Sequence, residues 1–160
     1  MISMDMALRH MKWADDRLFR EIASLPDRAL TFTYADPAWN VGHILHHMVR
    51  GGEWYRYILT GAKWRELTTP TSMTELDALR VYLMEIYEVL IEECAKPDEM
   101  VEFKDEDGPN SVPRAMILSQ ATYHSVEHRT HIATALEVSG LKAIDLDSYD
   151  LWHYVGTVSK

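Results

Sequence analysis

The sequence predicts an all-α fold, a four-helix bundle formed by one domain over residues 1–160. Four long stretches carry apolar residues at three- and four-residue steps, the pattern of amphipathic helices. Segments with Gly, Pro and Asp separate them, and four such helices pack as a bundle by default. With 160 residues and 47% hydrophobic content, the chain can bury a sizeable core.

The first helix is predicted over residues 4–25 and ends before Pro26. Its apolar stripe contains Leu8, Met11, Leu18, Ile22 and Leu25. We expect Trp13 and Phe19 to pack in the core or in an interface.

The second helix is predicted over residues 37–59, with Asp36 as its N-cap and Pro37 as its first residue. Gly51 and Gly52 lie in the middle of it, where each Gly costs about 1 kcal/mol relative to Ala. A close approach of another helix or of a ligand would explain the pair, and a local break is the alternative.

The third helix is expected to begin at Ser72, which forms a capping-box pattern with Glu75, and to reach about residue 95. Near its end lies the only cysteine, Cys94, so no intrachain disulfide can form, and a cytoplasmic location is expected. We expect Cys94 to be a small buried hydrophobic residue rather than a nucleophile.

A short hairpin or an extended loop is expected at residues 100–110, before the fourth helix. That helix is predicted over residues 113–138, with Gly140 as its C-cap signal. The remaining residues, 141–160, are too apolar to hang free, and we expect them to pack as a strap across the bundle.

The composition excludes several classes of partner. A net charge of −9 without a local Lys/Arg cluster disfavours binding to nucleic acid. No run reaches the ~18 apolar residues of a membrane span, and the N-terminal residues lack the features of a signal peptide. A small-molecule substrate is the remaining expectation.

Six of the eight histidines fall in two short stretches, one on the second predicted helix and one on the fourth. On the fourth, His124, His128 and His131 project into one narrow sector, because each helical residue turns by about 100°. That sector is the apolar face, where each imidazole nitrogen needs a partner. An i, i+4 pair of histidines can bind one metal ion, and hydrogen-bonded core histidines are the alternative.

On the second helix, His47 borders the apolar row, His46 points toward solvent, and His43 is intermediate. His10 and His153 have no helical relation to the other histidines, and we assign them no role.

Three charged residues near these histidines allow two interpretations each. Glu53 could line the rim of a site and Glu127 lies on a flank of the His124 direction, although plain surface acids are the more common case for both. Arg129 could bind an anionic substrate or form a salt bridge with an acid of the first helix.

Three motifs together span nearly the whole chain. They are the opening helix with Trp13-Ala14-Asp15; the segment Trp39–Met48, with His47 eight residues after Trp39; and the segment Tyr123–Ile132, with His124 and His128. All three resemble motifs of the DinB/YfiT-like superfamily, which usually has Asn in place of Asp15. The ending from Gly140 to Tyr149 also resembles the C-terminal strap of that family.

The resemblance implies a four-helix bundle with crossover connections, a homodimer, and a divalent metal bound by His47, His124 and His128. His131 stands where the family commonly has Gln. Known relatives include S-transferases that use low-molecular-weight thiols such as bacillithiol or mycothiol.

A site with three histidine ligands keeps an open coordination position, which is typical of catalytic centres. A thiol or a water bound there is activated, so we expect a thiol-dependent S-transferase or, as an alternative, a metal-dependent hydrolase. Nitrogen ligands favour Zn or Ni, with Fe or Mn as alternatives. We expect His131 to carry a proton in catalysis, or to be a fourth ligand, which would favour a non-catalytic metal-binding module.

Overall fold

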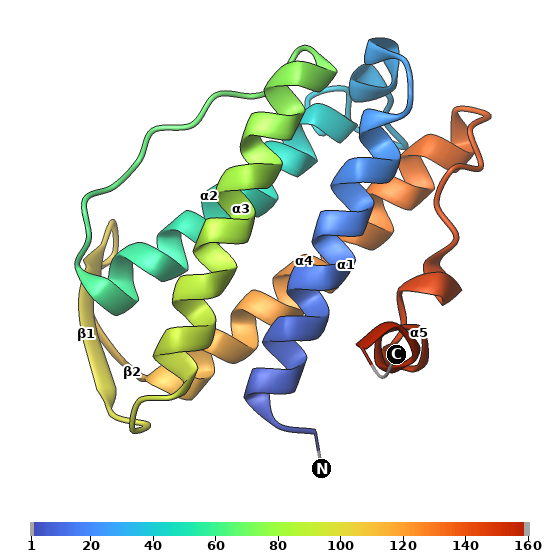
Figure 1. The fold of residues 1–160 in the computed structure, drawn as a ribbon. Helices are drawn as coiled ribbons and strands as arrows, with labels where there is room; N and C mark the ends of the chain where they lie inside the picture. Colours follow the sequence, from blue (N-terminus) through green and yellow to red (C-terminus); the bar gives the residue numbers. More distant parts are fainter. Residues whose placement is uncertain (1, 159–160) are drawn as a thin grey trace.

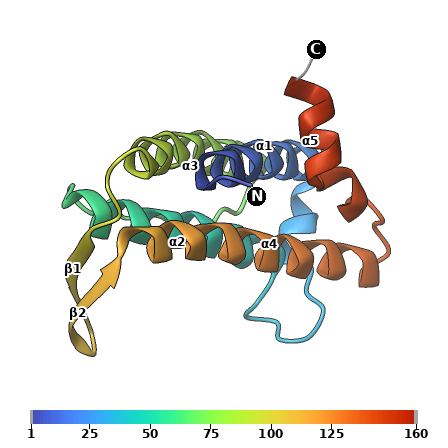
Figure 2. The same ribbon diagram turned by 90° about the horizontal axis from the view of Figure 1, so that it is seen from below.

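The structure is a computed structural model that describes residues 2–158, and it is mostly helical (Figure 1). The helices are α1 (Met4–Ala23), α2 (Val41–Thr60), α3 (Met73–Cys94), α4 (Arg114–Val138) and the short α5 (Leu151–Val158). The four long helices lie in two layers, α1 beside α3 and α2 beside α4 (Figure 2). All four long helices were predicted, and both ends of each lie within a few residues of the predicted positions.

Consecutive long helices are not the closest neighbours. The main packing partners of α1 are α3 and α4, and α2 packs against the same two helices. The connection from α1 to α2 therefore crosses from one layer to the other, and it contains a short 3-10 helix, η1 (Asp27–Thr31). This arrangement brings α2 and α4, which carry the two groups of histidines, side by side.

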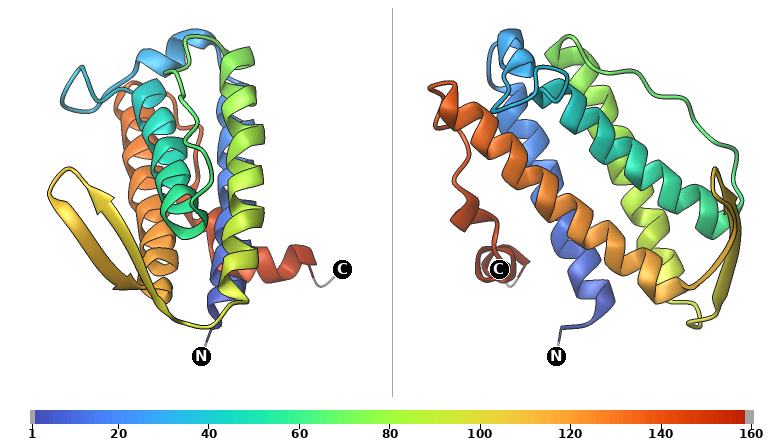
Figure 3. Two further views of the ribbon diagram at one scale, coloured as in Figure 1. Left: turned by 90° about the vertical axis from the view of Figure 1, so that its left-hand side faces the viewer. Right: turned by 180° about the vertical axis from the view of Figure 1, so that it is seen from behind.

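A β-hairpin connects α3 to α4. Strands β1 (Met100–Asp105) and β2 (Gly108–Pro113) pair antiparallel, and they extend beside the start of α4 (Figure 3). Gly108 has φ +123°, a backbone conformation that favours glycine in the tight turn. The expected hairpin or extended loop is thus a hairpin, and with its two strands the fold is not purely α.

The predicted start of α2 is wrong. Asp36 caps only a turn, in which its Oδ1 accepts from the Ala38 amide at 2.9 Å. After this turn Asn40 is extended, and its side chain accepts from the amide of His43 at 3.0 Å as the true N-cap. Pro37 therefore precedes the helix, which begins at Val41.

The other predicted helix ends follow the local signals. The Ser72 hydroxyl accepts from the Glu75 amide at 3.3 Å, while the Glu75 carboxylate accepts from the Thr71 amide at 2.7 Å. Gly140 follows the end of α4 with φ +85°. These contacts confirm the predicted start of α3 and the predicted end of α4.

The tail packs against α1, as expected, through two buried tyrosines, Tyr149 and Tyr154. It forms a 3-10 helix, η2 (Leu146–Tyr149), and then α5, which was not predicted. Not all its apolar residues are covered, because Trp152 is 86% exposed. Residues 159 and 160 of the predicted strap, like residue 1 of the predicted domain, lie outside the described residues.

The core lies between the two layers and includes fully buried Phe19 of α1, Ile44 of α2, Ile86 of α3 and Ile132 of α4. Within residues 2–158, no helix combines the length and the apolar composition that crossing a bilayer requires.

Candidate metal centre

Three histidines from two neighbouring helices meet at the α2–α4 interface. The ring centroids lie 5.0 Å apart for His47 and His124, 4.7 Å for His47 and His128, and 4.4 Å for His124 and His128. One ring nitrogen from each residue lies within 4.8 Å of the others, a spacing at which they could hold one metal ion. The structure therefore brings together the three residues that the sequence motifs single out.

The packing around these rings explains two sequence features. The Trp39 ring contacts His47 at 5.1 Å and His128 at 5.8 Å between centroids, so it holds both imidazoles from one side. A Cβ at Gly51 would lie 2.6 Å from Cε1 of His124, whereas a Cβ at Gly52 would lie 3.3 Å from Ile86 on α3. The glycine pair therefore marks close approaches, not a break in α2.

Gly51→Ala is expected to weaken metal binding by at least about tenfold, because the added methyl group displaces the His124 ring. Helix propensity alone would stabilise this variant by about 1 kcal/mol. Calorimetric titration of the metal-free protein with Zn²⁺ measures the affinity. Gly156→Ala on helix α5 is the matched control, since its Cβ meets no atom of residues 2–158 within 4 Å. Unchanged affinity in Gly51→Ala would contradict the expected displacement.

Burial keeps the three imidazoles neutral. Burial, and next the neighbouring His47, lowers the pKa of His124 to about 4. Burial and then the charges of His124 and His47 lower the pKa of His128 to about 4, and burial also lowers the pKa of His47. Neutral imidazole is the form that binds metals, so these residues are ready to act as ligands near neutral pH.

The depressed pKa values predict how the metal-free protein responds to acid. In the unfolded chain both histidines titrate near 6.5, so between about pH 6.5 and about pH 4 the unfolded state binds more protons than the folded state. The free energy of unfolding should therefore fall as the pH decreases through this range. Urea denaturation at several pH values measures it, and the double variant His124→Gln with His128→Gln should show a flatter dependence; an equally steep one would contradict the assignment.

Two ring nitrogens at this centre lack partners among the described residues. They are Nδ1 of His128 and Nδ1 of His131, and both are buried. Burying a polar atom without a partner is unfavourable, and a bound cation is one way to relieve this. The neutral, partly unsatisfied donor set therefore fits a divalent transition metal.

His131 lies beside the group of three but outside it. Its ring centroid is 5.4 Å from that of His128, and it stacks on Tyr34 at 5.7 Å. Within residues 2–158, the nitrogen atoms that gather within 4.8 Å come from His47, His124 and His128. His131 thus lies beside the cluster rather than within it.

The remaining histidines have local contacts. His46 does not simply point into solvent as expected, because it is half-buried and its Nε2 lies 3.3 Å from the Leu67 carbonyl oxygen. The His10 ring is buried, with Nε2 2.7 Å from the Tyr149 carbonyl oxygen. The exposed His153 ring contacts Asp150 at 2.8 Å. These contacts explain His10 and His153 without the metal centre.

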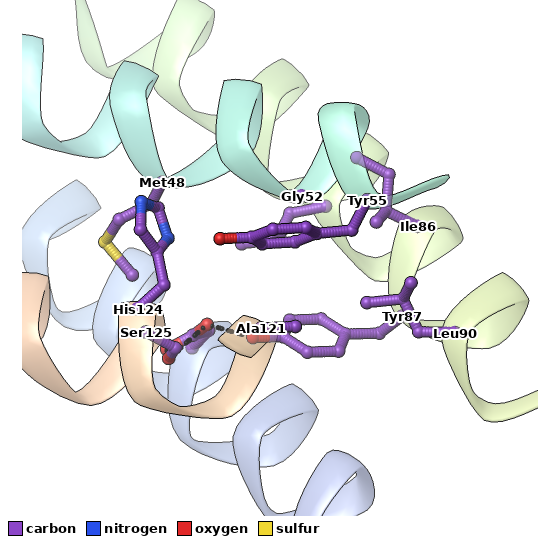
Figure 4. Close-up of a pocket in the computed structure, with 11 residues that line it drawn as sticks. Met48, Gly52, Tyr55, Ile86, Tyr87, Leu90, Ala121, His124 and Ser125 are labelled. Carbon is purple, nitrogen blue, oxygen red and sulfur yellow. Dashed lines mark hydrogen bonds between the residues drawn. The ribbon is translucent and has the colours of Figure 1, made fainter. Parts of the chain in front are cut away.

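A buried polar cluster, of which the sequence indicated only a possible ion pair of Arg129, joins α1 to α4 directly behind His124. Asp15 is 1% exposed and accepts hydrogen bonds from Tyr87 at 2.5 Å and from Ser125 at 2.7 Å. Arg129 completes it with an ion pair at 3.4 Å, which confirms the salt-bridge interpretation of that residue. The cluster borders a small internal cavity of about 10 Å³ that also reaches His124 (Figure 4). Burial raises the pKa of Asp15 despite these partners.

The surroundings of three further residues bear on the roles that the sequence suggested for them. Glu53 is neither on the rim nor on the surface: it is fully buried and accepts hydrogen bonds from Arg56 and from Tyr82 at 2.6 Å each. Glu127 is exposed. Cys94 is only half-buried, and burial raises the pKa of its thiol, which disfavours a nucleophilic role.

One side of the centre is open. A groove of about 400 Å³ runs along α2 and is lined by His47 and His124 together with residues of α2 and of the following loop. A small molecule in this groove can reach two of the three histidines. The arrangement can therefore hold an ion and also admit a second ligand to it.

The family model described as "DinB family" matches residues 1–154, nearly the whole chain. No protein with a curated description matches the chain.

Proposed function

Because the chain belongs to the DinB family, we propose that it is a metal-dependent enzyme that transfers a low-molecular-weight thiol to an electrophilic small molecule. In this proposal the four long helices form the bundle scaffold, and His47, His124 and His128 hold one divalent ion, most readily Zn or Ni. The observation that carries it is the meeting of three neutral imidazoles beside an open groove.

A bound divalent ion supplies Lewis acidity and favours the thiolate form of a thiol beside it. Residues of the chain bind the two reactants and accept the proton. In this proposal the groove receives the thiol and the electrophile beside His47 and His124, and His131, whose ring centroid lies 5.4 Å from that of His128, accepts the S–H proton. The sulfur electron pair then forms the new bond to carbon, and the leaving group departs with the electrons of the bond that breaks.

Thiol transfer needs no positioned water and no carboxylate base. This suits a centre at which the two acids singled out from the sequence are the exposed Glu127 and the buried, fully engaged Glu53. Hydrolysis and a non-catalytic metal-binding role are the alternatives from the sequence. The homodimer and the cytoplasmic location stay predictions.

Untagged protein would test the proposal in two steps. Elemental analysis should find one transition-metal ion per chain. The metal-loaded protein, offered a panel of thiols with monochlorobimane, should give a product that needs both the metal and His128. Metal uptake without product from any thiol would refute the transferase activity, and no metal uptake would refute the centre itself. His46→Ala, on the same helix as His47, is the control that should keep both properties.

A further inference from the structure

We propose that the groove beside the three histidines binds a small organic anion with a flat aromatic or unsaturated body. Its acid group would face Arg50, and its body would lie against Trp54 and Trp64. This inference rests on the proposed function, because it names the substrate class of the same centre. The groove volume of about 400 Å³ lies within the range typical of small-molecule sites.

Arg50 supplies the charge. It is exposed, it follows His47 by three residues on α2, and it forms no ion pair with any residue in the range 2–158. In a chain of net charge −9, this guanidinium places a positive charge at the groove. Its planar array of donors matches a carboxylate, which accepts two hydrogen bonds at once.

The aromatic wall supplies the shape. Trp54 stacks on Tyr57 at 5.8 Å, and Trp64 meets the same tyrosine edge-on at 6.1 Å between centroids. Trp54 also contacts Phe103 of β1 at 5.9 Å between ring centroids. Both tryptophans are half-buried by these contacts and still line the groove. Flat rings held in this way favour a flat ligand, which can stack on them or meet their edges.

Trp64 lies on the loop after α2, and the residues on both sides of it are anchored. Arg56 donates to the Lys63 carbonyl oxygen at 2.7 Å, and the Arg65 amide donates to the carboxylate of Glu53 at 2.7 Å. A fully buried carboxylate is unfavourable unless its hydrogen bonds are satisfied. Here those hydrogen bonds fix the part of the loop that carries Trp64, so this wall of the groove has a defined position.

The test uses two probes of the same shape, 2-naphthoate and its neutral amide, 2-naphthamide. Binding is followed by NMR through the indole N–H signals, in metal-free and in metal-loaded protein. The naphthoate should shift the signals of Trp54 and Trp64 in both forms and leave those of Trp13 and Trp152 unchanged. The naphthamide should bind about threefold to tenfold more weakly, because it lacks the charge.

Variants locate the two halves of the site. Arg50→Gln should weaken naphthoate binding about threefold to tenfold and leave naphthamide binding nearly unchanged. Arg28→Gln, which removes the same charge from an exposed position on η1, should change neither. Trp64→Ala should weaken both probes, whereas Trp152→Ala, at a residue that is 86% exposed on α5, should weaken neither.

The outcomes separate this inference from the proposed function. Equal affinity for the two probes, no binding at millimolar concentration, or equal losses in Arg50→Gln and Arg28→Gln would overturn it. Metal uptake together with any of these results would leave the metal centre standing. Binding of naphthoate that depends on Arg50, in a protein that takes up no metal, would support the groove and refute the centre.

Discussion

His128→Ala is expected to lower the affinity for Zn²⁺ by at least about 100-fold, because it removes one of the three ligands. Of the three imidazoles this one is the most buried, at 5% exposed, and it lies within 5 Å of both partners between ring centroids. Competition with a chromogenic chelator measures the change. His47→Ala and His124→Ala should give losses of the same order.

Two controls make that result specific. His46→Ala, one residue away from His47 but facing the Leu67 carbonyl, should keep the affinity. His131→Ala should also retain uptake, because its ring lies outside the group of three. Full metal occupancy in His128→Ala at low free Zn²⁺ would remove this residue from the centre, and strong loss in His46→Ala would show that the register of α2 is wrong.

Asp15→Ala is expected to reduce the free energy of unfolding by about 3–5 kcal/mol, because it leaves the guanidinium of Arg129 buried without its counter-charge. It also removes the acceptor of Tyr87 and Ser125. A loss of this size is a large part of the stability of a typical domain. Urea denaturation followed by circular dichroism measures it.

The matched control for this prediction is Asp5→Ala, which removes an exposed carboxylate of the same helix from its pair with Arg9. It should change stability little, since surface ion pairs contribute little. Asp15→Asn keeps a hydrogen-bond acceptor and should lose less than Asp15→Ala. Similar stability of Asp15→Ala and Asp5→Ala would contradict the role assigned to the cluster. Because Ser125 follows His124 directly, Asp15→Ala should also weaken metal binding.

The long helices were predictable because each has an apolar stripe, and most of their ends carry local signals that the structure uses. Asp36 misled the prediction of α2, since an Asp-Pro pair can cap a turn as well as a helix, and only the contacts made by Asn40 decide between them. The sequence could not decide between a hairpin and an extended loop after α3. A short alternating segment forms a hairpin only if a partner strand pairs with it.

The three histidines were predictable from helical spacing and from the family motifs, but their meeting across α2 and α4 depends on packing. The buried acids were missed because a carboxylate is usually exposed. A signal was present in each case. Asp15 lies on the stripe of α1 between Met11 and Leu18, and Glu53 follows the buried Val49 by one turn on α2. A charged residue within an apolar stripe indicates a buried ion pair.

X-ray absorption spectroscopy of the untagged, Zn-loaded protein would show whether three histidines bind one ion with an open position. We expect three imidazole nitrogens at about 2.0–2.1 Å and one exchangeable ligand, which becomes a sulfur at about 2.3 Å when a thiol is added. One nitrogen should be lost in each of the alanine variants of His47, His124 and His128. A shell of four imidazoles that does not change with thiol, or a nitrogen shell that survives in His128→Ala, would contradict this coordination.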